Sequence, residues 1–424
     1  MRESSTYFRN ALLIAVILGL CTYSLLFIYS TGYIGDEYPV RLNWQRQAFF
    51  LGAGLLLAMP VSCLLCRSWL RDWYIYGGYA VSLASLLLVL VFGHKTGGAT
   101  RWLAVGPFIF QPAEYAKIFT VLALALRLSS GNCGTLKSLL LSLAFAMPPM
   151  ALIMIEPSYG SAAAMLPPVA VMLLMHIPGR RLLLFTMLGT LLIIAVLASG
   201  LLWLRTEQGS KRADKILAAL SENRHFLKDY HVRRIKGYLD KTGDWNERQS
   251  VLTISSGGSS GKGYLQGTMK GLGYLPRTVA PTDFIFAVIC EELGFFYGAL
   301  PVILLYIILL SLLIYNGTAA LEERNLLFCT GIAMLLFMHI AINLAMTMRL
   351  LPIIGLPLPL LSYGGSYATA VFAGLGAAIA GKDSQLKENV PHSFTLQFGR
   401  LLRFSMNEMN IQDNNKNRKE RTGK

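Results

Sequence analysis

The sequence predicts an all-α membrane protein that crosses the bilayer about ten times. Of its 424 residues, 54% are hydrophobic and only 14% are charged. A soluble chain typically has about 25% charged residues, which help to cover its surface. The apolar residues also fall into segments of ~20 residues, the length at which a helix spans the hydrocarbon core.

The first apolar segment, 11–31, is too long for the hydrophobic part of a signal peptide and has no small-residue cleavage site. We therefore expect it to remain as a span. The split between the fifth and sixth spans depends on the stretch Glu-Pro-Ser-Tyr-Gly at 156–160. In chain order, the expected spans are 11–31, 47–66, 74–93, 112–128, 138–156, 160–178, 182–203, 283–314, 326–348 and 361–381.

Basic residues gather on alternate connections, so the positive-inside rule places both termini in the cytoplasm. This arrangement puts the basic loop 204–282, between spans seven and eight, outside. Loops longer than ~60 residues cross the membrane largely regardless of charge, so the rule is kept. We expect a transmembrane domain over 1–381, which includes this extracytoplasmic loop, and then a basic cytoplasmic tail, 382–424, with the composition of a disordered segment.

The formal net charge is +15, and the basic residues that produce it lie mainly on loops between apolar segments. Anionic membrane lipids and pyrophosphates are therefore expected partners, and nucleic acid is not. The six cysteines are scattered, which indicates no disulfide framework. Cys63 and Cys66 have the spacing of half a zinc site but no second pair, so we assign no metal to them.

Asp283 is the leading catalytic candidate. It stands in Pro-Thr-Asp-Phe-Ile-Phe, 281–286, after a glycine-rich basic loop and before a long apolar run. A carboxylate at the boundary between water and hydrocarbon is costly unless it faces a polar cavity. Glu291 and Glu292 follow in the same expected span, and we expect them to bond to neighbouring helices or to set local electrostatics.

Other polar residues have both a functional and a structural interpretation. Glu114 and Lys117 share a helix face, either as a self-neutralising pair or in a polar cavity where Lys117 holds a phosphate. Arg101 lies at head-group depth beside Trp102, as an interfacial anchor or a pyrophosphate ligand. His339 and Asn343 share a face of the ninth span, where such residues more often join helices than touch substrate.

Two segments rich in glycine or proline are not expected to form straight helices. The run from Ser255 to Gly263 can fold backbone amides around an anion, although a purely structural role is favoured about two to one. The apolar run 351–359 contains three prolines, so we expect it to re-enter the membrane or to cap a cavity.

Several motifs in a fixed order resemble the SEDS family (shape, elongation, division and sporulation), which includes RodA and FtsW. They are Gly-Ala-Thr-Arg-Trp at 98–102, Gln-Pro-Ala-Glu-Tyr-Ala-Lys at 111–117, Gly-Lys-Gly at 261–263, Pro-Thr-Asp-Phe-Ile-Phe-Ala at 281–287, Glu-Glu-Leu-Gly at 291–294, Gly-Leu-Pro-Leu-Pro at 355–359 and Ser-Tyr-Gly-Gly-Ser at 362–366. The resemblance extends from the first span to about residue 381.

The resemblance implies a peptidoglycan polymerase of the bacterial cytoplasmic (inner) membrane, with lipid II as substrate and a class B penicillin-binding protein as partner. The essential aspartate of the family falls on Asp283, as a general base that acts on the GlcNAc 4-hydroxyl and gives an inverting β-1,4 transfer. Arg101, Lys117, Arg234 and Lys262 are the candidates for steadying the diphosphate, and Glu114 and Asn343 complete the expected substrate site. No cofactor is implied, and assistance by a divalent cation is left open.

The chain departs from the family pattern where Gln-Pro-Asp-Leu-Gly-Thr is usual. It has Glu156-Pro157-Ser158 there, so one acid is lost and another stands two positions earlier. Glu156 is therefore expected to substitute in the substrate site, and the chain to be a divergent member. The alternative functions are a lipid II flippase and a non-enzymatic scaffold for a penicillin-binding protein. The motifs do not distinguish a role in elongation, division or sporulation.

Overall fold

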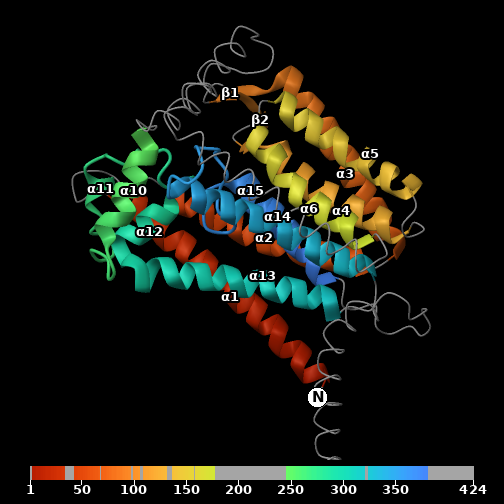
Figure 1. Ribbon diagram of the computed structural model, residues 1–424, viewed down its shortest axis with the longest axis horizontal. Coiled ribbons are helices and arrows are strands. Elements are labelled where there is room, and N and C mark those ends of the chain that lie inside the picture. Colours follow the sequence, from red (N-terminus) through yellow and green to blue (C-terminus); the bar gives the residue numbers. More distant parts are fainter. Residues whose placement is uncertain are drawn as a thin grey trace, which may run out of the picture.

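The computed structural model describes residues 2–33, 43–66, 68–96, 99–105, 108–130, 136–156, 158–176, 245–319 and 323–380. The predicted seventh span, the first half of the loop 204–282, Arg234 and the tail 382–424 lie outside these ranges. The described chain is a bundle of long helices with a group of short helices at one end (Figure 1).

In chain order, the described residues form twelve α-helices. They are α1 (Arg2–Gly32), α2 (Asn43–Cys66), α3 (Ser68–Phe92), α4 (Pro112–Ser129), α5 (Leu136–Ile155), α6 (Tyr159–His176), α10 (Trp245–Gly257), α11 (Thr268–Gly271), α12 (Ile285–Gly294), α13 (Leu300–Ala319), α14 (Glu323–Thr347) and α15 (Gly365–Ala380). A π-helical turn, η1 (Phe295–Ala299), joins α12 to α13.

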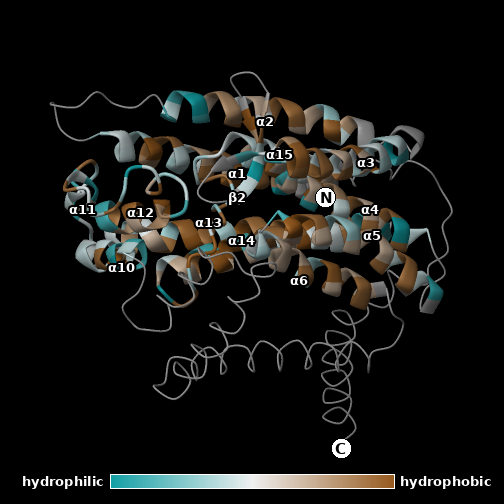
Figure 2. Cartoon of the chain, turned by 90° about the horizontal axis from the view of Figure 1, so that it is seen from above, coloured by the Kyte–Doolittle hydropathy of each residue, from teal (hydrophilic) through white to brown (hydrophobic). Residues whose placement is uncertain are grey.

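Five helical stretches in the described ranges are long and apolar enough to cross a membrane: Phe8–Gly32, Asn43–Cys63, Arg71–Phe92, Ile285–Ala319 and Glu323–Thr347. The apolar helices Leu140–Ile155, Tyr159–Met175 and Gly365–Ile379 are shorter. Apolar residues dominate the long helices, whereas α10 and α11 are mixed (Figure 2). A multi-pass membrane protein is thus supported, and the total of ten spans and their orientation stay predictions.

The prediction of an all-α fold misses a small antiparallel sheet between α3 and α4. Its strands are β1 (His94–Thr96), β2 (Ala99–Val105) and β3 (Phe108–Phe110), in the order β1-β2-β3. His94 pairs with Trp102, and Leu103 pairs with Phe110. Threonine, valine and aromatic residues favour strands, and glycines separate the three short runs in the sequence, so hairpins form here.

α4 lies at the centre of the bundle, and most of its residues are buried. It packs against α3, α5, α6, α14 and α15.

The contact between α2 and α15 brings two helix backbones close together. Such helix pairs need small residues where they touch. A Cβ on Gly376 of α15 would lie 2.6 Å from the carbonyl oxygen of Ala58 on α2, so the two backbones approach closely.

Two irregular segments shape the end of the bundle that carries α10 and α11. The apolar path from α12 to α13 is interrupted at Gly294, whose φ of +71° lies in the left-handed region. The segment 351–358 has no regular secondary structure, as its prolines predicted. Gly294 packs against the residues 259–261, and Gly355 of the second segment packs beside Asp283.

Candidate functional site

Asp283 lies in a turn just before α12, at the start of the apolar stretch Ile285–Ala319. Its backbone amide donates to the carbonyl of Val279 at 3.0 Å. Its side chain is partly exposed, whereas Phe284 and Ile285 behind it are buried. Because Asp283 precedes the helix, an argument from helical phase does not relate it to Glu291 and Glu292, and our expectation of a span from 283 started two residues early.

The proline-rich segment folds around this turn. A Cβ on Gly355 would lie 3.7 Å from the Asp283 Oδ2 atom, so that glycine backbone, at φ +77°, flanks the carboxylate. The amide of Tyr363 donates to the carbonyl of Pro281 at 2.8 Å, and the Ser362 hydroxyl donates to the carbonyl of Thr282. The tertiary structure therefore joins two motifs that lie more than 60 residues apart.

Asn343 on α14 fixes both sides of this contact. Its Nδ2 atom donates to the carbonyl of Asp283 at 3.0 Å and to the carbonyl of Leu356 at 2.7 Å. The side chain is fully buried. Both amide hydrogens are therefore used to join segments, which is the structural interpretation; contact of Asn343 with substrate stays a prediction.

One helical turn away on α14, His339 joins a buried polar cluster. The Lys117 ammonium lies 2.8 Å and 3.0 Å from the two carboxylate oxygens of Glu114 and 2.9 Å from His339 Nε2. His339 Nδ1 is 2.9 Å from the hydroxyl of Tyr367, and their rings stack. These four side chains line a small cavity.

The cluster shows that Glu114 and Lys117 form an ion pair with each other, as the interpretation of a self-neutralising pair requires. Lys117 is only 1% exposed, and its ammonium already has partners within the protein. A role in holding a substrate phosphate would require the cavity to open, and it stays a prediction. A charge buried among helices without a partner would be strongly destabilising, so each member of this pair needs the other.

Arg101 and Glu156 form a second, looser group. Burial raises the pKa of Glu156, at the turn between α5 and α6, to about 8, and the positive charge of Arg101 on β2 partly opposes that increase. Glu156 is 1% exposed, and within the described residues neither of its carboxylate oxygens has a hydrogen-bond donor. A Cβ on Gly160 would collide with Ile354, so the turn packs on the segment that flanks Asp283.

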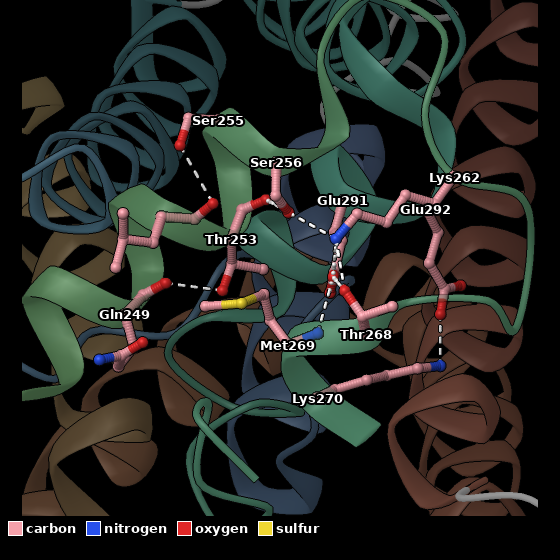
Figure 3. Close-up of polar contacts among 11 residues, drawn as sticks. Gln249, Thr253, Ser255, Ser256, Lys262, Thr268, Met269, Lys270, Glu291 and Glu292 are labelled. Atoms are coloured by element: carbon pink, nitrogen blue, oxygen red, sulfur yellow. Dashed lines mark hydrogen bonds and ion pairs between the residues drawn. The ribbon is translucent and has the colours of Figure 1, made fainter. Parts of the chain in front are cut away.

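Lys262 and the neighbouring Lys270 pair with the two adjacent glutamates of α12 (Figure 3). The Lys262 ammonium lies 2.7 Å from Glu291 Oε1 and also donates to the hydroxyls of Ser256 and Thr268. Lys270 pairs with Glu292, which accepts a further hydrogen bond from Ser30 of α1 at 2.6 Å. Burial lowers the pKa of Lys270, and the Glu292 carboxylate opposes that decrease.

These contacts agree with the expectation that Glu291 and Glu292 bond to neighbouring elements. Lys262 was expected to meet a diphosphate, but its three N–H donors already have acceptors within the protein. The glycine-rich run likewise directs the amides of Lys262 and Gly263 at protein carbonyls rather than around an anion. Its structural interpretation is therefore the one that the contacts favour.

Sequence reasoning missed the residues that hold these segments from a distance. Gln47 of α2 bonds to the backbone of Ser362 and Gly364, and Tyr306 of α13 donates to the carbonyl of Pro359 at 2.7 Å. Polar residues within apolar runs are the signal that could have identified Gln47 and Ser30. Within the described residues, no three His, Cys, Asp or Glu side chains gather as metal ligands would.

This geometry can support general-base chemistry. A carboxylate at the edge of the apolar core, with its backbone fixed from two sides, can accept a proton from a hydroxyl that comes within hydrogen-bonding distance. The fixed backbone keeps that acceptor in one orientation, which is what positions reacting groups for attack.

Comparisons with known proteins agree with the motifs. A family model described as "Cell cycle protein", FtsW/RodA/SpoVE, matches residues 10–382. The chain is 29% identical to the peptidoglycan glycosyltransferase MrdB of Escherichia coli (strain K12), over 87% of this chain and 92% of that one. It is 30% identical to the probable peptidoglycan glycosyltransferase FtsW of Thiomicrospira cyclica, over 87% and 90% of the two chains.

The fold also matches solved structures. One chain, from work on the structural coordination of polymerization and crosslinking by a peptidoglycan synthase complex, superposes with a TM-score of 0.66 and 27% identity. That match covers 88% of this chain and 98% of the other. Both the order of motifs and the arrangement of helices are therefore shared with these proteins.

Proposed function

Because the chain belongs to the FtsW/RodA/SpoVE family of cell cycle proteins, we propose that it is a peptidoglycan glycosyltransferase that uses lipid II. Its family members are named for this activity in several bacteria. The observation that carries the proposal is Asp283, whose carboxylate stands at the start of a membrane-length apolar stretch, flanked by Gly355 and held through Asn343.

In this mechanism Asp283 takes the proton from the 4-hydroxyl of the acceptor GlcNAc as that oxygen attacks the anomeric carbon of the donor. The bond from that carbon to the undecaprenyl pyrophosphate breaks, and the diphosphate leaves with its electron pair. Attack from the opposite face inverts the anomeric centre and gives a β-1,4 linkage. A lipid-linked donor fits a base at the start of a membrane-length apolar stretch.

The leaving diphosphate needs positive charge near it. Arg101 is partly exposed on β2 and is the best placed of the described candidates. Arg234 belongs to the same proposal but lies outside the described residues. Lys117 and Lys262 would first have to give up the carboxylates that they pair with, so we assign them a smaller share of this role.

We also propose a class B penicillin-binding protein as the partner and the bacterial inner membrane as the location. One similar chain was solved within a peptidoglycan synthase complex, which supports an assembly of this kind. A polymerase of lipid-linked precursors needs both the lipid surface and an enzyme that crosslinks its product during elongation, division or sporulation.

The first prediction is that Asp283→Asn lowers the rate of lipid II polymerisation by roughly 10²–10⁴-fold, because the base is lost while the shape is kept. The assay is polymerisation of labelled lipid II by the purified chain, with and without its partner. Asp72→Asn is the control, since Asp72 is half exposed and pairs with its neighbour Arg71. Full turnover by the Asp283→Asn variant would rule out the role of the base, and transport of lipid II without polymer would favour a flippase.

A further inference from the structure

The helix that follows Asp283 is interrupted at Gly294. The loop 258–263 forms hydrogen bonds with the backbone groups that the interruption leaves without helical partners. In an unbroken helix the amides of Phe295 and Phe296 would donate to the carbonyls of Glu291 and Glu292. Those carbonyls instead accept from the amides of Lys262 at 3.0 Å and Gly263 at 2.8 Å.

The two amides beyond the break are satisfied by the same loop. Phe295 donates to the carbonyl of Gly258, and Phe296 donates to the carbonyl of Ser259, each at 3.0 Å. Four backbone groups that would otherwise be unpaired in an apolar setting are therefore satisfied by residues 258–263. A buried backbone group that is left unpaired is costly, because it has lost its hydrogen bonds to water.

The contact is too close for side chains. A Cβ on Gly257 would lie 1.9 Å from the carbonyl oxygen of Cys290, and one on Gly261 would lie 2.2 Å from that of Glu292. A Cβ on Gly294 would lie 2.3 Å from the amide nitrogen of Gly261. This backbone contact explains why the sequence is rich in glycine here.

Two ion pairs reinforce the backbone contact. Glu291 and Glu292 are fully buried, and each is compensated by one lysine, Lys262 of the loop and Lys270 of α11 respectively. The amide of Met269 also donates to Glu291 at 2.8 Å. Figure 3 shows the two lysines reaching adjacent carboxylates, Lys262 from the loop and Lys270 from α11. Loss of either lysine would leave an uncompensated charge inside the protein.

We propose that residues 257–270 act as a splint across this break, and that Lys262 and Lys270 are positioning residues that fix α12 and thereby Asp283. α12 has ten residues, and Asp283 lies two residues before it. A break at a left-handed glycine would otherwise let this short helix pivot against α13. The link from the splint to catalysis rests on the proposed function, whereas the link from the splint to the position of α12 does not.

A pair of glycine substitutions separates the splint from ordinary backbone strain. Gly261→Ala and Gly273→Ala place a side chain at nearly the same φ, +79° and +75°, but only Gly261 touches α12. Nothing lies within 4 Å of the added atom at Gly273. Both variants of the full chain are reconstituted in lipid, and hydrogen exchange of the segment 285–296 is followed by mass spectrometry together with lipid II turnover.

We expect faster exchange over 285–296 in Gly261→Ala, with kcat lowered by roughly 10- to 100-fold and KM for lipid II nearly unchanged, because the base is misplaced. Gly273→Ala should match the wild type in both measurements. Wild-type exchange and turnover in Gly261→Ala would overturn the proposal, and so would equal effects of the two variants.

A charge exchange distinguishes positioning from phosphate binding. Lys262→Met and Glu291→Lys should each speed exchange and lower kcat, and the exchanged pair Lys262→Glu with Glu291→Lys should recover part of both, since a lysine at 291 cannot accept from the Met269 amide. If Lys262 holds a diphosphate instead, Lys262→Met raises KM, and the exchanged pair recovers slow exchange without turnover, which would overturn the positioning role. If the wild type makes no polymer, the proposed function fails, and the exchange measurement still decides whether the splint holds α12.

Discussion

Lys117 has two partners, and this arrangement predicts the result of swapping it with Glu114. We expect the double variant Glu114→Lys with Lys117→Glu to fold, because the pair of charges is kept in the core, yet to stay inactive in lipid II polymerisation. Lys117 also contacts His339 at 2.9 Å, and in the proposed mechanism it takes a smaller share in holding the diphosphate. Each single variant should be less stable by about 3–5 kcal/mol, since it leaves a buried charge alone.

His339→Gln is the control for the contact between Lys117 and His339. A glutamine oxygen can still accept from the Lys117 ammonium, so this variant keeps the contact. Thermal unfolding separates loss of fold from loss of turnover in all of these variants. Recovery of most of the activity by the swapped pair would show that Glu114 and Lys117 only neutralise one another, since a self-contained pair is roughly symmetric.

Glu156 is the second residue whose charge can be tested. It is buried, its pKa is raised by burial and lowered by Arg101, and we expect it to substitute for an acid that the family usually has two positions later. We predict that Glu156→Gln slows polymerisation by about tenfold, which corresponds to about 1.4 kcal/mol in activation free energy, because the electrostatic contact with Arg101 is lost. Adding Ser158→Asp should restore part of the rate, because it returns a carboxylate to the family-like position.

The measurement is turnover of lipid II by the single and double variants. Arg101→Gln is the matched partner change: if Arg101 and Glu156 act together, its effect and that of Glu156→Gln should not add. Near-normal turnover by Glu156→Gln would show that the charge is dispensable and that Glu156 only ends α5.

At the scale of elements, the close pairing of α2 and α15 gives a prediction for stability. Gly376→Ala should destabilise the protein by about 1–3 kcal/mol, because the new methyl group meets the backbone of α2 at Ala58. Gly52→Ala on α2 is the control, since nothing lies within 4 Å of its added atom. Alanine at that position should leave stability unchanged or raise it by up to ~1 kcal/mol.

Thermal unfolding in lipid or detergent checks this pair of variants. Equal melting temperatures for the two alanine variants would contradict close packing between α2 and α15. The same comparison tests the site indirectly, because Gln47 near the start of α2 holds the segment 362–364 beside Asp283. We therefore expect Gly376→Ala to lower turnover as well as stability.

At the scale of the whole molecule, much of the architecture could be predicted because a bilayer makes span length and hydrophobicity local properties. Every expected span except the seventh overlaps a described helix. The small sheet between α3 and α4 was missed, since β1 and β3 have only three residues each and the seven residues of β2 do not alternate strictly between apolar and polar. The helix break at Gly294 was missed too, because composition does not show which loop satisfies the exposed backbone.

The sequence by itself determined the membrane class, the helical segments, the family motifs and Asp283 as the candidate base. Tertiary structure alone decided which polar groups meet: Asn343 with Asp283 and Leu356, Lys117 with His339, and Lys262 with Glu291. The reason is physical. Hydrophobicity acts on each segment through the lipid around it, whereas a hydrogen bond or ion pair depends on a few ångströms between atoms that the fold brings together from distant positions.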